Sequence, residues 1–280
     1  MSQIYDFSYG RRYRGPVQAV IFDWAGTIVD YGCVAPAVVF VEVFEQRQVP
    51  ITMAEARAPM GAPKKDHIRA ITEMDTVRRR WQEAHGRLPS EADVEAMYED
   101  FVPRQIACLS DYSALIPGTL EAVAELRKRG VRIGTNTGYS SEMTAVNLAD
   151  AKAQCFEPDS CVSASDVPAG RPYPFMCLKN AIELQVDCVE ACVKVDDTVP
   201  GVEEGLNAGM WSIGLAVSGN EVGLSLEDWQ ALPEAEQAAK RAQAYRRLYQ
   251  SGAHFVIDDV SQLLPCIDEI GQRLARGERP

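Results

Sequence analysis

The sequence lacks any run of apolar residues close to the roughly 18 that cross a bilayer, and no apolar stretch follows its arginine-rich start. We therefore expect neither a membrane span nor a secretory signal. Basic residues are also scarce, since 28 lysines and arginines face 40 acidic residues and the formal net charge is −12. A chain this acidic, without a concentrated basic face, repels nucleic acid and anionic membranes, so we expect neither as a partner.

Cysteine forms no regular framework. Of eight scattered cysteines, only Cys188 and Cys192 stand four residues apart, on a segment expected to be helical. A metal site there would need two further ligands, and none is visible nearby. Reduced, partly buried thiols in a cytoplasmic protein are therefore expected. The length of 280 residues, 46% of them hydrophobic, suits one large or two moderate domains with a substantial core.

Short apolar runs rich in β-branched residues predict five buried parallel strands. Helical patterns separate them, an alternation typical of a right-handed α/β sheet. Roughly 75 residues between the first two runs have helical patterns only, and this insertion is a candidate lid over the carboxyl edge of the sheet. A polar segment at 219–252 is expected to be peripheral, helical toward its end and without chemistry. The five runs cover residues 17–22, 131–135, 191–197, 210–217 and 254–259.

The strongest motif is FDWAGTIVD at 22–30, which places the Asp23 carboxylate, the flexible backbone of Gly26 and a hydroxyl at one strand end. A strand-to-loop turn that begins with aspartate would look the same, but three further polar motifs follow in order. The first of these, TNTGYSS at 135–141, offers the Thr137 hydroxyl beside main-chain N–H groups. Such donors at a strand end suit phosphate oxygens, although a polar turn is the other interpretation.

Gly138 belongs to the same motif and brings main-chain N–H groups within reach of an anion. PAGRPYP holds one cation, Arg171, in a loop stiffened by proline, and arginine offers forked donors to a phosphoryl group. VDDTVPG at 195–201 sets Asp196 and Asp197 side by side at a strand end. Paired acids there are costly unless they share a cation, which favours a Mg²⁺ site.

This order of motifs resembles the haloacid dehalogenase superfamily. The resemblance implies a Rossmann-like parallel-sheet core of residues 17–32 and 112–280, an inserted helical cap of residues 33–111, and an N-terminal extension of residues 1–16. It also implies an aspartate nucleophile and phosphoryl transfer with Mg²⁺. Members that act on phosphate esters usually carry an aspartate two residues after the nucleophile, as general acid. Here that residue is Ala25, which cannot protonate a leaving oxygen.

The helical insertion suggests another route. PMGAPKKDHIRA at 59–70 presents Lys64 and Lys65 beside His67. Adjacent ammonium groups depress each other's pKa, and a closed lid would desolvate them further. A neutral lysine can form a Schiff base with a carbonyl substrate, and the protonated imine is an electron sink that lets a carbon atom leave. A solvated helix start is the other interpretation, but the missing acid at position 25 favours the chemistry.

Five blocks narrow the resemblance to the phosphonoacetaldehyde hydrolase family: FDWAGTIVDYGCVAP, ARAPMGAPKKDHIRAITEM, TGYSSEM, DVPAGRPYPFMC and EGLNAGMWSIGL. The resemblance implies that Lys64 is the Schiff-base lysine and Asp23 the nucleophile. It implies Mg²⁺ ligation by Asp23, the Ala25 carbonyl and Asp197. The residues implied to bind the substrate or to support imine formation are Thr137, Gly138, Arg171, Met60 and His67.

The implied reaction is hydrolysis of the phosphorus–carbon bond of phosphonoacetaldehyde, through an imine on Lys64 and an aspartyl phosphate on Asp23, in 2-aminoethylphosphonate degradation. The family also implies a homodimer joined through the lid, for which the apolar run 35–44 is a candidate interface. Some relatives carry an acid at the position of Gly201, for which Asp196 could compensate. Another superfamily phosphatase or dehalogenase, or a binding protein that has lost catalysis, remains an alternative.

Overall fold

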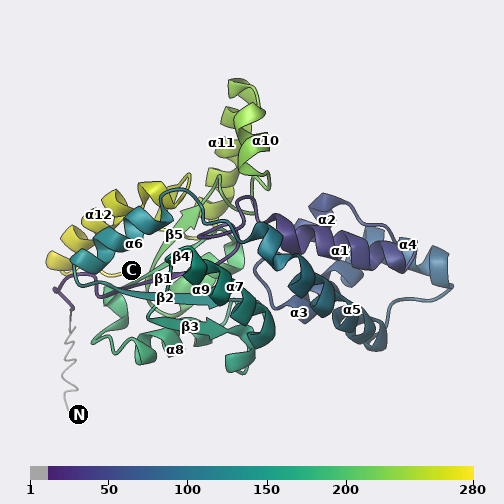
Figure 1. The fold of residues 1–280 in the computed structure, drawn as a ribbon, viewed down its shortest axis with the longest axis horizontal. Coiled ribbons are helices and arrows are strands. Elements are labelled where there is room, and N and C mark those ends of the chain that lie inside the picture. The colour runs from purple at the N-terminus through teal and green to yellow at the C-terminus, as the bar shows by residue number, and fades with distance from the viewer. Residues whose placement is uncertain (1–11) are drawn as a thin grey trace, which may run out of the picture.

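A parallel sheet of six strands forms the centre of the molecule (Figure 1). The computed structural model describes residues 12–280, so residues 1–11 of the expected extension lie outside the described part. The strand order is β3-β2-β1-β4-β5-β6, and every neighbouring pair is parallel. The strands are β1 (Ala19–Phe22), β2 (Arg132–Thr137), β3 (Ser160–Ser163), β4 (Cys192–Asp196), β5 (Trp211–Leu215) and β6 (Phe255–Ile257).

The five strands predicted from apolar runs are confirmed, and β3 is the one that was missed. Its sequence, SCVS, is short and polar, yet it pairs with β2 along four residues. The chain places β2 and β3 on one side of β1 and then crosses to β4 on the other side. The strand order therefore reverses beside β1, and the carboxyl edge at such a point is where open α/β sheets bind ligands.

Helices cover both faces of the sheet because its strands are buried on both sides. In β1, Val20 and Phe22 join a core shared with α6, α7 and α12, whereas Ala19 and Ile21 join a core shared with α8 and the end of α9. A strand between two helical layers needs an apolar run without polar alternation. These helices are α6 (Thr119–Lys128), α7 (Ser141–Ala153), α8 (Phe175–Glu183), α9 (Val199–Asn207) and α12 (Leu263–Ala275).

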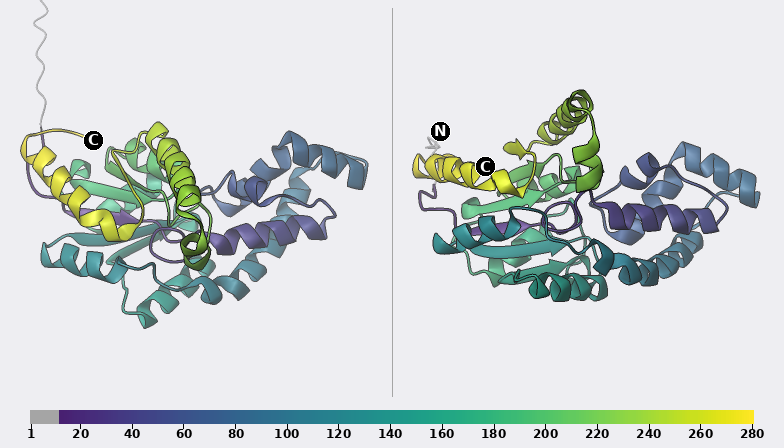
Figure 2. Two further views of the ribbon diagram at one scale, coloured as in Figure 1. Left: turned by 90° about the horizontal axis from the view of Figure 1, so that it is seen from above. Right: turned by 45° about the horizontal axis from the view of Figure 1, so that its top comes forward.

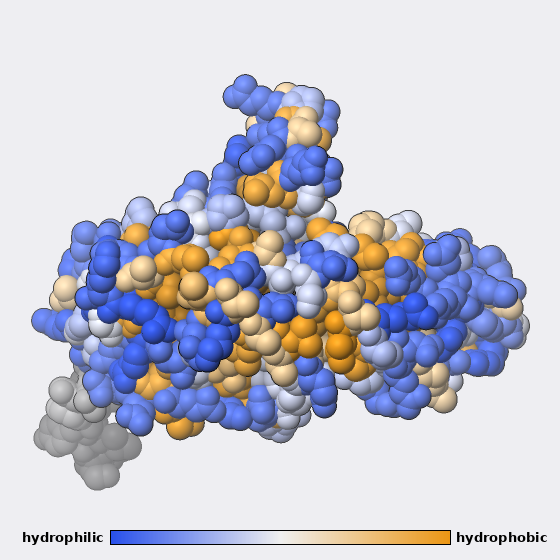
Figure 3. All heavy atoms as spheres, viewed as in Figure 1, coloured by the Kyte–Doolittle hydropathy of each residue, from blue (hydrophilic) through white to orange (hydrophobic). Residues whose placement is uncertain are grey.

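The helical insertion between β1 and β2 forms the predicted cap, which lies beyond one end of the sheet in every view (Figures 1 and 2). Its helices form a hydrophobic core that also includes Tyr139 and Met143 from the sheet domain and is distinct from the clusters that cover the sheet. The outer end of the cap is mainly hydrophilic on the face seen in Figure 3. The cap helices are α1 (Val34–Gln46), α2 (Met53–Arg57), α3 (Lys64–Glu73), α4 (Asp75–His85) and α5 (Glu91–Leu109).

Helix α1 contains the apolar run 35–44 that was a candidate dimer interface. Most of its apolar side chains are buried, and Val39, Phe40 and Phe44 belong to the core of the cap. The hydrophobic character of this helix is therefore largely explained by packing within one chain. The homodimer stays a prediction.

The structure also tests the expected helix at Cys188 and Cys192 and the polar segment at 219–252. The expected helix at Cys188 and Cys192 is wrong, because a short 3-10 turn follows Cys188 and Cys192 begins β4. Both thiols are free, as are the other six. Helices α10 (Leu226–Ala231) and α11 (Glu234–Gln250) confirm a helical end for the segment 219–252 and project from the sheet (Figure 1). The start of this segment is not peripheral as expected, because the buried Asn220 donates its backbone N–H to Asp197. Among residues 12–280, no helix combines the length and apolar character that crossing a membrane requires.

The cap core yields a test of the cap's own stability. Phe101 is fully buried and stacks on Phe40, with ring centres 4.5 Å apart. Removing a buried phenyl ring leaves a cavity, so Phe101→Ala is expected to lower the free energy of unfolding by about 3–5 kcal/mol in a urea titration. Ile182→Ala is the control, since Ile182 is 76% exposed and its loss should change little. An unchanged midpoint for Phe101→Ala would contradict this packing.

Candidate active site

Three neighbouring strands bring the polar motifs together. Asp23 directly follows β1, Thr137 ends β2, and Asp197 directly follows β4. Strands β2 and β4 flank β1 in register, with Phe22 beside Thr135 on one side and beside Val195 on the other. The carboxyl ends of the three strands therefore meet at one place, as parallel pairing requires.

The cap covers these strand ends and closes a narrow cavity of about 20 Å³. Eight of the nine residues predicted for the site line it, and His67 is the exception. From the core, the lining residues are Asp23, Ala25, Thr137, Gly138, Tyr139, Arg171, Asp197 and Thr198. From the cap and the segment that leads into it, they are Cys33, Pro36, Met60, Gly61, Ala62 and Lys64.

The loop before α3 inserts closely between loops of the core, and glycines make this possible. A Cβ atom on Gly138 would lie 3.0 Å from the carbonyl oxygen of Ala62. Gly61 has φ +96°, and a Cβ atom there would lie 2.5 Å from Oγ1 of Thr198. Side chains at either position would hold the cap away from the strand ends, so Gly138 has a packing role besides the N–H group that was predicted for it.

Arg171 is buried at the centre of the site. Its Nη2 donates to Oδ1 of Asp23 at 2.6 Å, and its Nε donates to Oε2 of Glu204 at 3.0 Å. Nη2 also donates to Oδ1 of Asn136 at 2.7 Å and lies 3.3 Å from Oδ2 of Asp196. Nη1 makes no hydrogen bond with the described residues, so its N–H groups are free for a ligand in the cavity. The structure therefore places the Arg171 side chain beside Asp23, and the expected role of Arg171 toward a phosphoryl group stays a prediction.

Motif analysis missed the buried partners that hold Arg171. Lys194 lies within β4, where its Nζ donates to Asn136 Oδ1 at 2.5 Å and lies 2.9 Å from Asp196 Oδ2. Nδ2 of Asn136 donates to the Glu204 carboxylate at 3.1–3.2 Å. Lysine inside the apolar run CVKVD was a signal, since a buried charge needs a partner. Glu204, on α9, opens the block EGLNAGMWSIGL, but that pattern assigned it no contact, because its partners come from distant parts of the chain.

Asp196 and Asp197 are adjacent but have different surroundings. Oδ1 of Asp196 accepts hydrogen bonds from the backbone N–H and hydroxyl of Thr198, at 3.0 and 2.7 Å. Although burial opposes ionisation, the charges of Arg171 and Lys194 hold the pKa of Asp196 below its ordinary value. By contrast, Oδ2 of Asp197 accepts one N–H group, from Asn220 at 2.7 Å, and its Oδ1 has no hydrogen-bond partner among the described residues.

The buried carboxylates fit a divalent cation. Oxygens of Asp23, Asp196 and Asp197 lie within 4.8 Å of one another. Burial, together with the charges of Asp23 and Asp196, raises the pKa of Asp197 well above its ordinary value. Counting Glu204, four carboxyl groups face two cations, Arg171 and Lys194, so ionisation of all four would leave two negative charges without a partner. The free Oδ1 of Asp197 is a hard oxygen ligand of the kind that Mg²⁺ prefers.

Lys64 reaches the cavity from the first turn of α3 and is buried. Its Nζ lies 4.9 Å from the ring centre of Tyr139 and 5.6 Å from that of Phe40, and it forms no salt bridge with the described residues. Burial lowers the pKa of Lys64. The expected effect of Lys65 is wrong, because the Lys65 side chain is exposed on the outside of the helix and pairs with Glu95.

His67 lies behind Lys64 in the core of the cap. Its ring stacks on Phe40, and Nε2 is 2.8 Å from the carbonyl oxygen of Ala56. Burial, followed by the charge of Lys64, lowers the pKa of His67 well below its ordinary value. The ring is therefore neutral with Nε2 as the donor, which leaves Nδ1, unpartnered among the described residues, as an acceptor.

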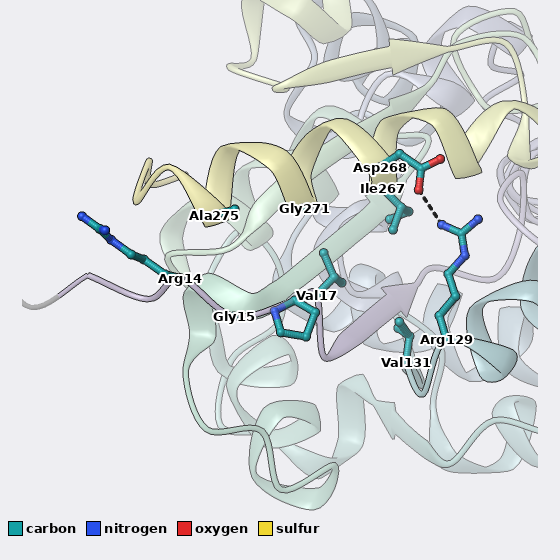
Figure 4. A pocket seen from close by; sticks show the side chains of 10 residues that line it. Arg14, Gly15, Val17, Arg129, Val131, Ile267, Asp268, Gly271 and Ala275 are labelled. Atoms are coloured by element: carbon teal, nitrogen blue, oxygen red, sulfur yellow. Dashed lines mark hydrogen bonds and ion pairs between the residues drawn. The ribbon is translucent and has the colours of Figure 1, made fainter.

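A wider pocket lies at the amino ends of the strands, opposite the site (Figure 4). It is lined mainly by apolar side chains such as Val17, Val131 and Ile267. Arg129 at its edge pairs with Asp268 at 2.6 Å. Its lining does not combine an acid, a base and a nucleophile. We therefore do not assign the active site to this pocket, although it is larger than the cavity under the cap.

Comparison with known proteins places the chain in a family. A haloacid dehalogenase-like hydrolase family model matches residues 17–209. A phosphonoacetaldehyde hydrolase of Hahella chejuensis is 51% identical over 274 residues, which cover 98% of this chain and 93% of the relative. The chain belongs to the phosphonoacetaldehyde hydrolase family. The resemblance in the sequence motifs is confirmed.

Other members of the phosphonoacetaldehyde hydrolase family agree with this placement. The Vibrio cholerae phosphonoacetaldehyde hydrolase is 49% identical over 267 residues, covering 95% of this chain and 98% of the relative. The crystal structure of a phosphonoacetaldehyde hydrolase-like protein from Oleispira antarctica has 46% identity and a TM-score of 0.96, and the match covers 99% and 100% of the two chains. The Rossmann-like core with an inserted helical cap is therefore confirmed, and the chain is a hydrolase.

The position of Gly201 yields a direct test of the carboxylate cluster. A Cβ atom on Gly201 would overlap the carboxylate of Asp196. Asp196 thus fills the space of a side chain at position 201, and its expected compensating role stays a prediction. Gly201→Ala is expected to destabilise the fold by about 1–3 kcal/mol through overpacking, and to displace Asp196 from Lys194.

The matched control for that substitution is Gly271→Ala. Gly271 lies in α12, and a Cβ atom there would meet nothing within 4 Å. Alanine is a better helix former than glycine, so this variant should match or exceed the native stability by up to about 1 kcal/mol. The melting temperatures of both variants, measured by thermal unfolding, test the packing of Asp196 against Gly201. Equal melting temperatures for the two would contradict the packing of Asp196 against Gly201.

Proposed function

We propose that this hydrolase cleaves the phosphorus–carbon bond of phosphonoacetaldehyde, releasing acetaldehyde and phosphate in the degradation of 2-aminoethylphosphonate. The observation that carries the proposal is that a buried lysine, Lys64, lines the same cavity as Asp23, while position 25 is alanine. A phosphate ester needs an acid for its leaving oxygen, but a carbon leaving group needs an electron sink. The names of the relatives from Hahella chejuensis and Vibrio cholerae support this substrate.

Imine formation begins the proposed reaction. Burial lowers the pKa of Lys64, which increases the fraction of neutral amine that can attack the aldehyde. Loss of water from the adduct gives an imine, which is protonated on nitrogen. The free Nδ1 of His67 would accept a hydrogen bond from a water molecule on the Lys64 side during these proton transfers, so His67 would act through Lys64. Met60 lines the cavity beside Cys33 and supports the lysine by packing.

Cleavage follows by attack of the Asp23 carboxylate on phosphorus. The electron pair of the phosphorus–carbon bond becomes the carbon–carbon double bond of an enamine on Lys64, and the π pair of the iminium moves to nitrogen. The phosphoryl group is then an aspartyl phosphate on Asp23. Protonation of the enamine carbon and hydrolysis of the resulting imine release acetaldehyde and restore Lys64. Water then attacks the aspartyl phosphate, which releases phosphate and restores Asp23. No general acid is needed at Ala25.

The phosphonate would be held at the strand ends. Nη1 of Arg171 and the main chain at Gly138 offer donors to its oxygens. The hydroxyl of Thr137 already accepts the N–H of Tyr139 at 3.2 Å, so its own proton is available to the substrate. Oxygens of Asp23, Asp197 and the Ala25 carbonyl would hold Mg²⁺. When bound, the ion offsets the repulsion between the carboxylate nucleophile and the anionic phosphonate.

The cap would control access to this site. We propose the boundaries given above, with residues 33–111 as the cap and residues 17–32 and 112–280 as the core. The cavity is too narrow to admit substrate freely, so cap opening would precede binding, and closure would exclude water until the imine has formed. We also infer a homodimer and, from the eight free thiols, a cytoplasmic location.

Borohydride reduction tests imine formation directly. The protein is treated with phosphonoacetaldehyde, Mg²⁺ and borohydride, and its peptides are analysed by mass spectrometry. We expect one adduct, on Lys64, which carries an ethyl group when the phosphorus–carbon bond breaks before reduction. Asp23→Asn should still form the imine but carry the intact phosphonoethyl group. Lys65 is the internal control, because it is adjacent in sequence yet faces away from the cavity.

Two results would contradict this proposal. Absence of a substrate-dependent adduct on Lys64 in folded protein would favour another phosphatase or dehalogenase of the superfamily that uses Asp23. Full turnover by Lys64→Arg would exclude the imine as well, since we expect a loss of at least about 10³-fold from removing a covalent catalyst.

The lowered pKa of Lys64 predicts a pH dependence for trapping. Only the neutral amine attacks the aldehyde, so the trapping rate should rise with pH and reach a plateau once the pH exceeds the pKa of Lys64. Because burial lowers that pKa, the plateau should begin at a lower pH than for an ordinary exposed lysine. Trapping rates between pH 6 and pH 10 measure this. A rate that rises throughout this range would contradict a desolvated Lys64.

A further inference from the structure

Arg57, at the carboxyl end of α2 in the cap, reaches across the junction between cap and core. Its Nη1 donates to the carbonyl oxygens of Gly32 and Cys33, at 2.8 and 3.1 Å, and to Oδ1 of Asn220 at 3.2 Å. Its Nη2 donates to the carbonyl oxygen of Gly223 at 3.0 Å. Arg57 forms no salt bridge within residues 12–280, so its guanidinium is occupied by neutral oxygens from two segments.

The first segment is the hinge where the chain leaves the core for the cap. Gly32 and Cys33 both have left-handed backbone conformations, with φ +91° and +49°. The N–H of Gly32 donates to the carbonyl oxygen of Ser218 at 2.6 Å, and a Cβ atom on Gly32 would overlap the carbonyl group of Leu224. The hinge therefore packs directly against the second segment, the loop of residues 218–224.

Asn220 connects this loop to the carboxylate cluster. Its side-chain Nδ2 donates to the carbonyl oxygen of Arg57 at 3.3 Å, while its Oδ1 accepts the Arg57 guanidinium. Both ends of the amide are therefore held by one residue of the cap. The backbone N–H of Asn220 donates to Oδ2 of Asp197 at 2.7 Å. The other oxygen of Asp197 is the one without a partner among the described residues.

Glycines let the same loop lie directly on Asp197. A Cβ atom on Gly219 would overlap Cβ of Asp197, and one on Gly26 would overlap its carboxylate. The hydroxyl of Ser218 donates to the carbonyl oxygen of Gly26 at 2.8 Å. The loop thus encloses one side of Asp197 at backbone distance, and any displacement of the loop would move the carboxylate.

We propose that Arg57 is a positioning residue that couples the seating of the cap to metal binding by Asp197. With the cap seated, Arg57 holds the loop 218–224, and Asn220 in that loop fixes Oδ2 of Asp197 so that Oδ1 is presented to the ion. The coupling is reciprocal, so an ion on Asp197 favours the seated cap. This inference rests on the metal role of Asp197 in the proposed function.

Calorimetric titration with Mg²⁺, in the absence of substrate, tests the coupling. Arg57→Met keeps the length of the side chain and removes its donors. Loss of a group that orients a metal ligand typically weakens metal binding 10- to 100-fold, and we expect a loss in this range. Arg69→Met is the matched control, because Arg69 is also in the cap but pairs with Asp66 and Glu91 on its surface.

A second variant and a second readout separate positioning from general damage. Asn220→Ala should also weaken Mg²⁺ binding. The double variant should lose less Mg²⁺ affinity than the two single losses combined, because both residues act through one contact. In native protein, Mg²⁺ should slow amide hydrogen exchange in the hinge and in the loop 218–224. Arg57→Met should abolish this slowing, and Arg69→Met should retain it.

Mg²⁺ affinity within twofold of native in Arg57→Met, with metal-dependent protection of the hinge intact, would overturn the inference. Should Arg57→Met fail to fold, an unchanged affinity in Asn220→Ala overturns it equally. Native protein that binds no Mg²⁺ would also overturn it. Borohydride trapping on Lys64 distinguishes these outcomes from failure of the imine mechanism, because Arg57 and Asn220 do not line the substrate cavity.

Discussion

The ion pairs of Arg171 are the interaction on which the site depends. Four carboxylates and two cations are buried together at the carboxyl edge of the sheet, and an unpaired charge in such a place would cost several kcal/mol. Arg171 bonds to Asp23 and Glu204 and lies beside Asp196, so one side chain holds Asp23, the proposed nucleophile, against the body of the core. The remaining negative charge lies toward Asp197, where a divalent ion would balance it.

The ion pairs of Arg171 and Lys194 also explain why Asp196 and Asp197, the two adjacent acids at the end of β4, have different contacts. Asp196 forms ion pairs through Oδ2 with Lys194 and Arg171 and accepts hydrogen bonds through Oδ1 from Thr198, and these contacts fix its position. Asp197 keeps one oxygen free among the described residues. Gly201 is needed because Asp196 occupies the space where its side chain would stand. In the proposed site, Asp196 would balance charge and Asp197 would bind the ion.

Most strands of the sheet and the place of the candidate site could be predicted from the sequence, because β-branched runs that end in polar residues mark the strands and their carboxyl ends. The strand β3 was missed because SCVS carries no apolar pattern. The side of α3 on which each lysine lies was also missed, because helical periodicity turns Lys65 away from Lys64. The contacts of Glu204, Asn136 and Asn220 could not be predicted, because they depend on how distant segments fold together.

The most direct measurement of the central claim is an anomalous difference map from crystals grown with Mn²⁺, a hard divalent ion that can replace Mg²⁺ on oxygen ligands. The account predicts one strong peak between Asp23 and Oδ1 of Asp197, with Asp196 still held by Lys194 and Arg171. A peak on Asp196 in place of Asp197, or no peak at the carboxyl edge of the sheet, would contradict it.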